Sequence, residues 1–367
     1  MKKVLLALFL ITTAVLMGCS KITFDPVQII DQQTFATAGP RFTSAPTPDP
    51  TPTPEPTPEP TPVPTETPIV TTTYKSCAKI LYVRDKPDAR NSTVVYKLKY
   101  EEKVELIGDV GNGFSSIMFE GRVCYCSTKY LVPADETLYG YLELTDNGQK
   151  VYVVDVRLFI PDIEVFQIFA TDNNICHVPL YENPVPVLRM ETVKKLKMAA
   201  EKFAADGYRI KLYDAYRPKS VQFKLFDVIQ ISAYISNPYN GKASNHNRAA
   251  AVDITLVDSD GNELAFPTPM HTFEKISYRS SRDKWTEEQR NNVDYMTDVM
   301  TSCGFTTITS EWWHFGDSDA KSFMVLAYNE RTSDGSEVER YYEMDPIGIP
   351  RRTKAQLQFI IDLFYGG

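Results

Sequence analysis

The sequence predicts two folded parts of different class, a small all-β barrel over residues 74–133 and an α+β domain over residues 138–367. Short β-type runs alternate with turn residues in the first part. Helical and strand-like segments mix in the second part without a regular β-α-β alternation, which favours α+β over a doubly wound sheet. The chain has 367 residues and 43% hydrophobic content, enough for two or three domains with real cores.

Residues 1–18 begin with two lysines and continue as an apolar run from Val4 to Met17, the arrangement of a secretory signal peptide. The run is too short to span a bilayer comfortably. It ends in L-M-G-C, up to Cys19, which resembles the lipobox of bacterial lipoproteins. The resemblance implies that Cys19 is lipidated. We therefore expect an extracytoplasmic lipoprotein, anchored in the cell membrane and facing the cell wall.

Residues 19–73 form the predicted tether and linker. Between Pro46 and Pro68 proline alternates with threonine and acidic residues, so there are almost no apolar side chains to bury. Alternating prolines favour the polyproline II conformation, which rises about 3.1 Å per residue. This segment is predicted to be a semi-rigid spacer with a reach of about 70 Å.

The net charge limits which molecules the chain can bind, and the cysteine content limits its disulfides and structural metal sites. The formal net charge is −8, and removal of Lys2 and Lys3 with the signal peptide brings it to about −10, which argues against nucleic acid as a partner. Cys77, Cys124 and Cys126 cluster in the barrel region, so an exported chain could join Cys77 to either of the other two. The chain has no C-x-x-C pair, and a structural zinc knuckle is not expected.

Five short strands are predicted within residues 74–133, separated by turn signals such as D-K-P-D and G-N-G. They are Ile80–Val83, Val94–Leu98, Lys103–Ile107, Phe114–Phe119 and Arg122–Cys126. The runs L-Y-V-R-D-K-P and E-G-R-V-C-Y-C-S-T-K-Y-L resemble a bacterial SH3 domain. That resemblance implies a cell-wall targeting module. A structural barrel without a ligand is the alternative.

In the α+β part, helices are expected where apolar residues recur at helical spacing, and strands where they alternate. Thr286 is the predicted N-cap of the last helix, and Gly207 and Gly304 follow helix ends. The predicted helices are Glu191–Asp206, Lys219–Ile231 and Glu287–Cys303, and the predicted strands are Val151–Ile160 and Tyr208–Tyr213. Neither a glycine-rich phosphate loop nor a G-x-S-x-G motif occurs in the sequence.

The candidate chemistry begins with S-N-H-N-R-A-A-A-V-D, in which His246 precedes Asp253 by seven residues. Catalytic zinc takes three protein ligands and keeps a fourth position open. The motif E-W-W-H-F offers His314 as a third ligand and Glu311 as a carboxylate beside the site. Zinc lowers the pKa of a bound water to near 7, and a carboxylate within reach can take its proton as the water attacks a peptide carbonyl.

A third motif, D-A-Y-R-P, places Arg217 between a predicted strand and a proline turn. From there its guanidinium can point into a cleft. A fixed arginine stabilises the negative charge that develops on a peptide carbonyl oxygen, and it does so without any change of protonation state.

These three motifs, in this order, resemble the zinc D-alanyl-D-alanine dipeptidases of the VanX type over roughly residues 150–317. The resemblance implies a compact α+β fold with a central antiparallel sheet, shared with other peptidases of the bacterial wall. It implies one zinc ion per catalytic domain, bound by His246, Asp253 and His314. Glu311 would then be the general base and Arg217 the transition-state stabiliser.

The resemblance also implies substrate-binding residues and shows two departures from the family pattern. Ser244 matches a residue that helps to hold the substrate carboxylate. Ala249 stands where the family has glycine, which costs about 1 kcal/mol if the position needs a positive φ. His271 falls where the family has an aspartate that receives the ammonium group of the dipeptide, unless the alignment slips and Glu274 takes this place. A histidine there puts the preference for free dipeptides in doubt.

Three functions remain open at this point. The first is a zinc dipeptidase that hydrolyses D-Ala-D-Ala at the cell envelope. The second is a D-Ala-D-Ala carboxypeptidase or endopeptidase that acts on peptidoglycan stem peptides, which suits a chain with a lipid anchor, a spacer and a wall-binding module. The third is a lipoprotein that binds the wall without catalysis, and the presence of all five chemical positions disfavours it.

Overall fold

The computed structural model describes residues 68–232 and 234–366. The predicted signal peptide, the lipidation site Cys19 and most of the proline-rich linker lie outside the described residues. Within the described ranges, none of the helices combines the length and the apolar character that a membrane crossing requires.

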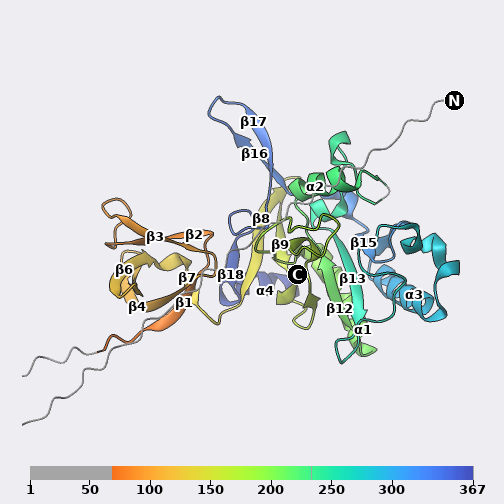
Figure 1. Cartoon of the computed structure of the whole chain (residues 1–367), viewed down its shortest axis with the longest axis horizontal. Coiled ribbons are helices and arrows are strands. Elements are labelled where there is room, and N and C mark those ends of the chain that lie inside the picture. Colours follow the sequence, from red (N-terminus) through yellow and green to blue (C-terminus); the bar gives the residue numbers. More distant parts are fainter. Residues whose placement is uncertain (1–67, 233, 367) are drawn as a thin grey trace, which may run out of the picture. The chain divides into compact units, whose positions relative to one another are not determined.

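Residues 72–133 form one antiparallel sheet of seven strands in the order β3-β2-β6-β5-β4-β1-β7 (Figure 1). Its buried core contains Val83, Leu98 and Ile117. The strands are β1 (Thr72–Ser76), β2 (Ile80–Arg84), β3 (Val94–Lys99), β4 (Lys103–Gly111), β5 (Phe114–Phe119), β6 (Arg122–Ser127) and β7 (Leu131–Pro133). The five predicted strands are therefore confirmed, and β1 and β7 are added to them.

The predicted barrel closure is not seen. The sheet order runs from β3 to β7, and no pairing joins these two edges among the described strands. Strand propensity sets the number of strands, whereas closure requires hydrogen bonds between the two edges, which propensity does not encode. Cys77, Cys124 and Cys126 are all free thiols, so the disulfide that the sequence allowed is not formed.

The remaining residues fold as mixed α and β with two further main sheets, in agreement with the predicted α+β class. One sheet has the order β10-β12-β13-β15-β14, antiparallel except for the β10–β12 pair. Its strands are β10 (Glu164–Val165), β12 (Arg209–Asp214), β13 (Ala251–Val257), β14 (Phe305–Thr307) and β15 (His314–Asp317). The second sheet is antiparallel, and its strands in order are β11 (Val187–Arg189), β9 (Gln149–Asp155), β8 (Leu138–Asp146) and β18 (Arg351–Thr353).

Four helices and a hairpin complete the described part. They are α1 (Met190–Ala205), α2 (Lys219–Ile229), α3 (Glu287–Ser302), α4 (Gln358–Gly366) and the hairpin of β16 (Ala327–Arg331) and β17 (Glu337–Tyr341). Helices α1, α2 and α3 confirm the predicted helices to within two residues at each end. Thr286 caps α3 as predicted, because its hydroxyl accepts a hydrogen bond from the backbone N–H of Gln289.

The predicted strand Val151–Ile160 ends early, at Asp155. The Asp155 carboxylate accepts a hydrogen bond from the backbone N–H of Arg157 and starts a short 3-10 turn, Val156–Leu158. An aspartate that bonds its own backbone two residues on competes with the strand ladder. The strand therefore stops there, although the apolar residues continue.

Helix α1 joins the two main sheets of this part into one core. Its buried face, which includes Val193, Leu196 and Phe203, contacts β12 in one sheet and β9 and β11 in the other. The segment after the last motif also belongs to this core, since β18 pairs with β8, and Phe364 of α4 stacks on Phe159 with ring centroids 3.9 Å apart. Figure 1 shows β18, in blue, beside the yellow β8.

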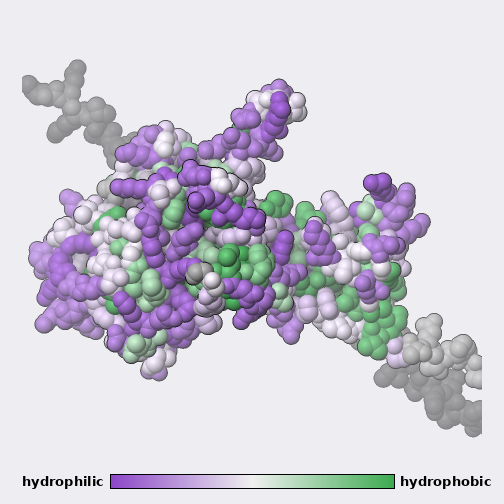
Figure 2. Space-filling view, turned by 180° about the vertical axis from the view of Figure 1, so that it is seen from behind, coloured by the Kyte–Doolittle hydropathy of each residue, from purple (hydrophilic) through white to green (hydrophobic). Residues whose placement is uncertain are grey.

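The outer surface mixes hydrophilic residues with smaller hydrophobic areas, as the face in Figure 2 shows. Exposed large apolar side chains occur on several elements, among them Tyr82, Tyr328 and Phe359. Single exposed apolar residues of this kind are normal on protein surfaces.

The register of the five-stranded sheet brings the polar side chains of the candidate site next to one another. Asp253 in β13 lies opposite Asp214 in β12 on one side and opposite His314 in β15 on the other. Residues that face each other across neighbouring strands project from the same side of a sheet. Three polar side chains are therefore aligned in one row across three neighbouring strands of the sheet.

Candidate active site

His246 reaches this row from a 3-10 turn, Asn245–Arg248, that precedes β13. Ser244 caps the turn: its hydroxyl accepts a hydrogen bond from the backbone N–H of His246 at 3.3 Å, and the Asn247 side chain bonds back to the backbone of Ser244. The turn ends at Ala249, which has φ 54° and is fully buried. The position therefore does require the left-handed conformation, at a cost of about 1–2 kcal/mol for alanine.

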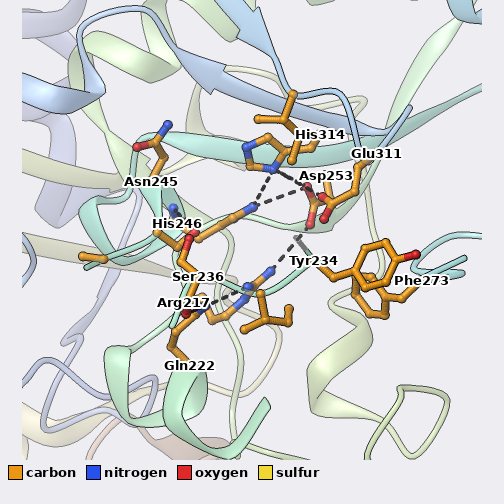
Figure 3. Close-up of a pocket in the computed structure, with 14 residues that line it drawn as sticks. Arg217, Gln222, Tyr234, Ser236, Asn245, His246, Asp253, Phe273, Glu311 and His314 are labelled. Carbon is orange, nitrogen blue, oxygen red and sulfur yellow. Dashed lines mark hydrogen bonds and ion pairs between the residues drawn. The ribbon is translucent and has the colours of Figure 1, made fainter. Parts of the chain in front are cut away.

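His246, Asp253 and His314 form a buried cluster whose ligand atoms all lie within 4.8 Å of one another, close enough to hold a metal ion. The Nε2 atom of His246 lies 3.2 Å from Nδ1 of His314 and 3.3 Å from Oδ1 of Asp253. The same Oδ1 atom is 3.0 Å from Nδ1 of His314. Figure 3 shows the three side chains converging on one point.

A hydrogen bond outside the cluster orients the His246 ring. Its Nδ1–H donates to the carbonyl oxygen of Ala215 at 2.7 Å, which leaves the Nε2 lone pair directed at Asp253 and His314. Ligating histidines in metalloproteins are held in the same way, by a bond from the second ring nitrogen to a carbonyl or carboxylate. The donor set and its orientation therefore fit a metal site.

The electrostatics favour a charged Asp253 beside a neutral His314. Burial opposes ionisation of Asp253, but the nearby histidines, His246 foremost, outweigh it and hold the pKa of this carboxyl well below its usual range. Burial also lowers the pKa of His314, although Asp253 opposes that shift. Burial acts to lower the pKa of His246 as well, but Asp253 and Asp214 outweigh it and raise that pKa above its usual value. A neutral imidazole beside a carboxylate is the protonation state that metal binding needs.

Glu311 lies at the edge of the cluster, with its Oε2 atom 4.0 Å from Nδ1 of His314, and is 5% exposed. Burial, together with the charge of Asp253, raises the pKa of Glu311 well above its usual range. A carboxyl group with a raised pKa can both accept and return a proton near neutral pH.

Arg217 approaches the cluster from the opposite side, after β12 (Figure 3). Its Nε–H donates to Oδ2 of Asp214 at 2.8 Å, a second bond joins Nη2 to the same oxygen, and Nη1–H donates to Oε1 of Gln222 at 3.1 Å. The guanidinium also lies over the Phe169 ring, 4.7 Å from its centroid. Its Nη2 atom is 3.6 Å from Oδ2 of Asp253, so a fixed positive charge borders the His246–Asp253–His314 cluster.

A cavity of about 160 Å³ opens in front of the cluster. Arg217, Ser244, His246, Asp253, Glu311 and His314, all predicted from the sequence, line it together. The other lining residues are Gln222, Tyr234, Ile235, Ser236, Ala243, Asn245, Phe273 and Ile308. Six of the seven residues predicted for the site thus meet at one cavity.

His271 differs from its predicted place. It was expected to face the substrate, but it is not among the residues that line the cavity. Its Nε2 atom instead lies 2.9 Å from Oδ2 of Asp253, and its side chain is buried. The alternative Glu274 is exposed and does not line the cavity either. The backbone at His271 is left-handed, with φ 55°, and its ring is held beside Asp253 by stacking on Phe169 and Phe273.

Sequence reasoning missed several residues that shape the site. Asp214 holds Arg217 and is itself fully buried; its position at the start of D-A-Y-R-P, three residues before the arginine, was a usable signal. Gln222 braces the same guanidinium one helical turn later. Tyr234 and Ser236 lie in an irregular segment with no pattern, so only the fold reveals them.

Comparisons with known proteins agree with this geometry. Residues 149–336, half of the chain, match the peptidase family described as D-Ala-D-Ala dipeptidase. A D-alanyl-D-alanine dipeptidase of Escherichia coli (strain K12) is 30% identical over 175 residues, which cover 48% of this chain and 89% of that protein. The corresponding enzymes of Enterococcus faecium and Streptomyces coelicolor are 28% and 27% identical, over 40% and 33% of this chain and 82% and 67% of theirs.

The matched segment contains β9 to β15 and all the residues that line the cavity. The chain is therefore a member of the D-Ala-D-Ala dipeptidase family of peptidases.

Proposed function

We propose that the protein is a zinc-dependent hydrolase that cleaves D-alanyl-D-alanine at the cell envelope. The observation that carries the proposal is the buried His246–Asp253–His314 cluster, with Glu311 and Arg217 at its border in one cavity. Nitrogen and oxygen donors in a three-residue set are the ligands that catalytic zinc uses. Zinc bound there would polarise a peptide carbonyl and make water a competent nucleophile near neutral pH.

Glu311 supplies the proton transfer. Its carboxylate takes a proton from the attacking water and later gives it to the leaving amine, so that the same residue acts first as base and then as acid. Its raised pKa suits the second of these tasks, because the carboxyl group must keep the proton until the carbon–nitrogen bond breaks.

Arg217 stabilises the negative charge that develops on the carbonyl oxygen. Because Asp214, Gln222 and Phe169 already fix its guanidinium, the arginine needs no reorganisation when the charge appears. Ser244 is proposed to donate its hydroxyl to the substrate carboxylate. The oxygen of that hydroxyl already accepts a backbone N–H, which leaves its own hydrogen free to point into the cavity.

One observation favours a second candidate, a carboxypeptidase or endopeptidase acting on peptidoglycan stem peptides. Among the described residues, Asp253 and Glu311 are the sole acidic side chains that line the cavity, and both have roles in the proposed chemistry. No further carboxylate in the described lining is available to pair with the ammonium group of a free dipeptide. A substrate whose amino end is acylated does not need such a partner.

The proposed location rests on the sequence alone. The predicted signal peptide, the lipobox-like sequence that ends at Cys19 and the proline-rich segment support a location outside the cytoplasm, on a lipid anchor. The seven-stranded sheet of residues 72–133 is then proposed to bind the cell wall, in keeping with the resemblance of its sequence to bacterial SH3 domains. Both features would bring the catalytic part close to peptidoglycan.

A comparison of three substrates tests the proposal. The full chain, solubilised in detergent and loaded with zinc, is offered D-Ala-D-Ala, an N-acylated peptide ending in D-Ala-D-Ala, and cross-linked wall. Release of D-alanine from the free dipeptide, abolished by a chelator, is the expected result. Release only from the acylated peptide would establish the second candidate, and no turnover of any substrate would leave a wall-binding protein without catalysis.

A further inference from the structure

The two carboxylate oxygens of Asp253 have different neighbours. Oδ1 faces the ring nitrogens of His246 and His314, at 3.3 and 3.0 Å. Oδ2 faces away from them, 2.9 Å from Nε2 of His271 and 3.6 Å from Nη2 of Arg217. Figure 3 shows contacts leaving both sides of the Asp253 carboxylate. Oδ1 thus faces the two histidines of the candidate metal site, and Oδ2 faces a second layer of side chains formed by His271 and Arg217.

The His271 ring is held firmly in this second layer. It stacks on Phe169 and Phe273, with ring centroids 5.0 and 5.7 Å apart, and the Trp313 ring lies 5.8 Å away. Its backbone adopts φ 55°, a conformation that a non-glycine residue keeps only where its surroundings enforce it. The guanidinium of Arg217 lies over the same Phe169 ring, so this ring contacts both residues that neighbour Oδ2 of Asp253.

The hydrogen-bonding pattern fixes the role of each ring nitrogen. A carboxylate is only an acceptor, so Nε2 of His271 must carry the hydrogen in this contact. Its Nδ1 is buried and has no hydrogen-bond partner in the described part of the chain, which suits a lone pair better than a second N–H. His271 therefore donates a hydrogen bond through Nε2 alone, and Asp253 accepts it.

We propose that His271 is a positioning residue that binds Oδ2 of Asp253 and so presents Oδ1 alone to the metal. The inference rests on the proposed zinc site. An aspartate free to turn can bind a metal through one oxygen or both, and binding through both would occupy coordination space that a catalytic site keeps open. Residues that orient ligands in this way raise metal affinity and activity by about 10- to 100-fold.

The test compares two substitutions of this residue in the full chain. His271→Phe keeps a flat ring for the stacking contacts but removes the donor, whereas His271→Gln keeps an N–H donor near the position of Nε2. Zinc affinity is measured by competition with a chromogenic chelator, and the absorption spectrum of the cobalt-loaded protein reports the coordination geometry. We expect His271→Phe to bind zinc about 10- to 100-fold more weakly with an altered cobalt spectrum, and His271→Gln to restore both.

His177 provides a matched control, because it is an exposed histidine that also has a left-handed backbone, with φ 53°. His177→Phe should leave zinc affinity and the cobalt spectrum unchanged. If His271→Phe does not fold, His271→Asn replaces it, because asparagine tolerates the left-handed conformation while its shorter side chain does not reach Oδ2.

The outcomes distinguish a failure of the proposed zinc site from a failure of the positioning role of His271. Failure of the wild-type chain to bind zinc would overturn the proposed function itself. Wild-type zinc affinity and an unchanged cobalt spectrum in His271→Phe, or in His271→Asn, would overturn the positioning role alone. Equal loss of affinity in the glutamine and phenylalanine variants would also contradict it, since the donor would then not be the property that matters.

Discussion

At the scale of single residues, the proposed mechanism divides its tasks between groups that would hold a metal and groups that would move charge. The ligand atoms of His246, Asp253 and His314 all lie within 4.8 Å of one another, whereas Glu311 lies at the border of this cluster, with its Oε2 atom 4.0 Å from Nδ1 of His314. This separation means that metal binding and proton transfer can be removed independently.

Substitution of Glu311 by glutamine tests that independence. The variant should keep its zinc affinity, because Glu311 is not part of the metal cluster, but it should lose about 10²- to 10⁴-fold in kcat, because the amide cannot take a proton. His314→Ala should lose zinc and activity together. Metal analysis and initial rates on the same samples give the answer, and substantial turnover by Glu311→Gln would contradict the assignment of the base.

Arg217 is best tested by lysine rather than alanine. Alanine would leave the buried Asp214 charge without its guanidinium partner, at a cost of up to about 3–5 kcal/mol in stability, and would confuse folding with catalysis. Arg217→Lys keeps the charge but not the forked contacts to Asp214 and Gln222, so kcat/KM should fall about 10²- to 10³-fold. Unfolding curves recorded beside the kinetics show whether the loss is catalytic, and unchanged kcat/KM would remove Arg217 from the mechanism.

The residues that sequence reasoning located are those with a chemical signature in a short motif. His246, Asp253, Glu311 and His314 could be chosen because few histidines exist and their spacing suits zinc. The place of His271 could not be predicted, since a motif gives the type of a residue but not the direction of its side chain. In the structure, the left-handed backbone at φ 55° and the stacking on two phenylalanine rings accompany the contact of its ring with Asp253.

At the scale of elements, α1, α2 and α3 followed from their periodicity and capping residues, which are local properties. The short strands β10, β14 and β18 carry two or three residues each and have no such local signal. Their pairing is decided by neighbours distant in sequence, as when β18 joins β8 across roughly two hundred residues. The missing barrel closure has the same origin.

Helix α3 offers a test at this scale. Thr286 and Gln289 form a reciprocal capping box at its start, with the backbone N–H of Thr286 donating to Oε1 of Gln289 at 2.9 Å. Thr286→Ala should lower the free energy of unfolding by about 1 kcal/mol, while Thr286→Ser should be close to neutral. Urea unfolding measures both, and equal stability of the alanine and serine variants would show that the cap does not contribute.

At the scale of the whole molecule, the proposed metal binding would be coupled to stability. A zinc ion that binds only the folded chain stabilises it, by about 2.7 kcal/mol when free zinc is a hundred times the dissociation constant. A chelator should therefore lower the unfolding temperature at pH 7.5. The difference between loaded and chelated samples should shrink on acidification, because protonated histidines do not bind zinc. Calorimetric scans at several pH values measure it, and a chelator effect independent of pH would argue against histidine ligands.

The row formed by Asp214, Asp253 and His314 has a consequence for the fidelity of folding. A slip of β13 by one residue against its neighbours would turn Asp253 to the other face of the sheet and drive an apolar side chain into its place. The same error would disrupt the apolar core and separate Asp253 from His246 and His314. Under the proposed zinc binding, metal occupancy would report correct strand alignment, and it would then serve as an assay for correct assembly in refolded or secreted preparations.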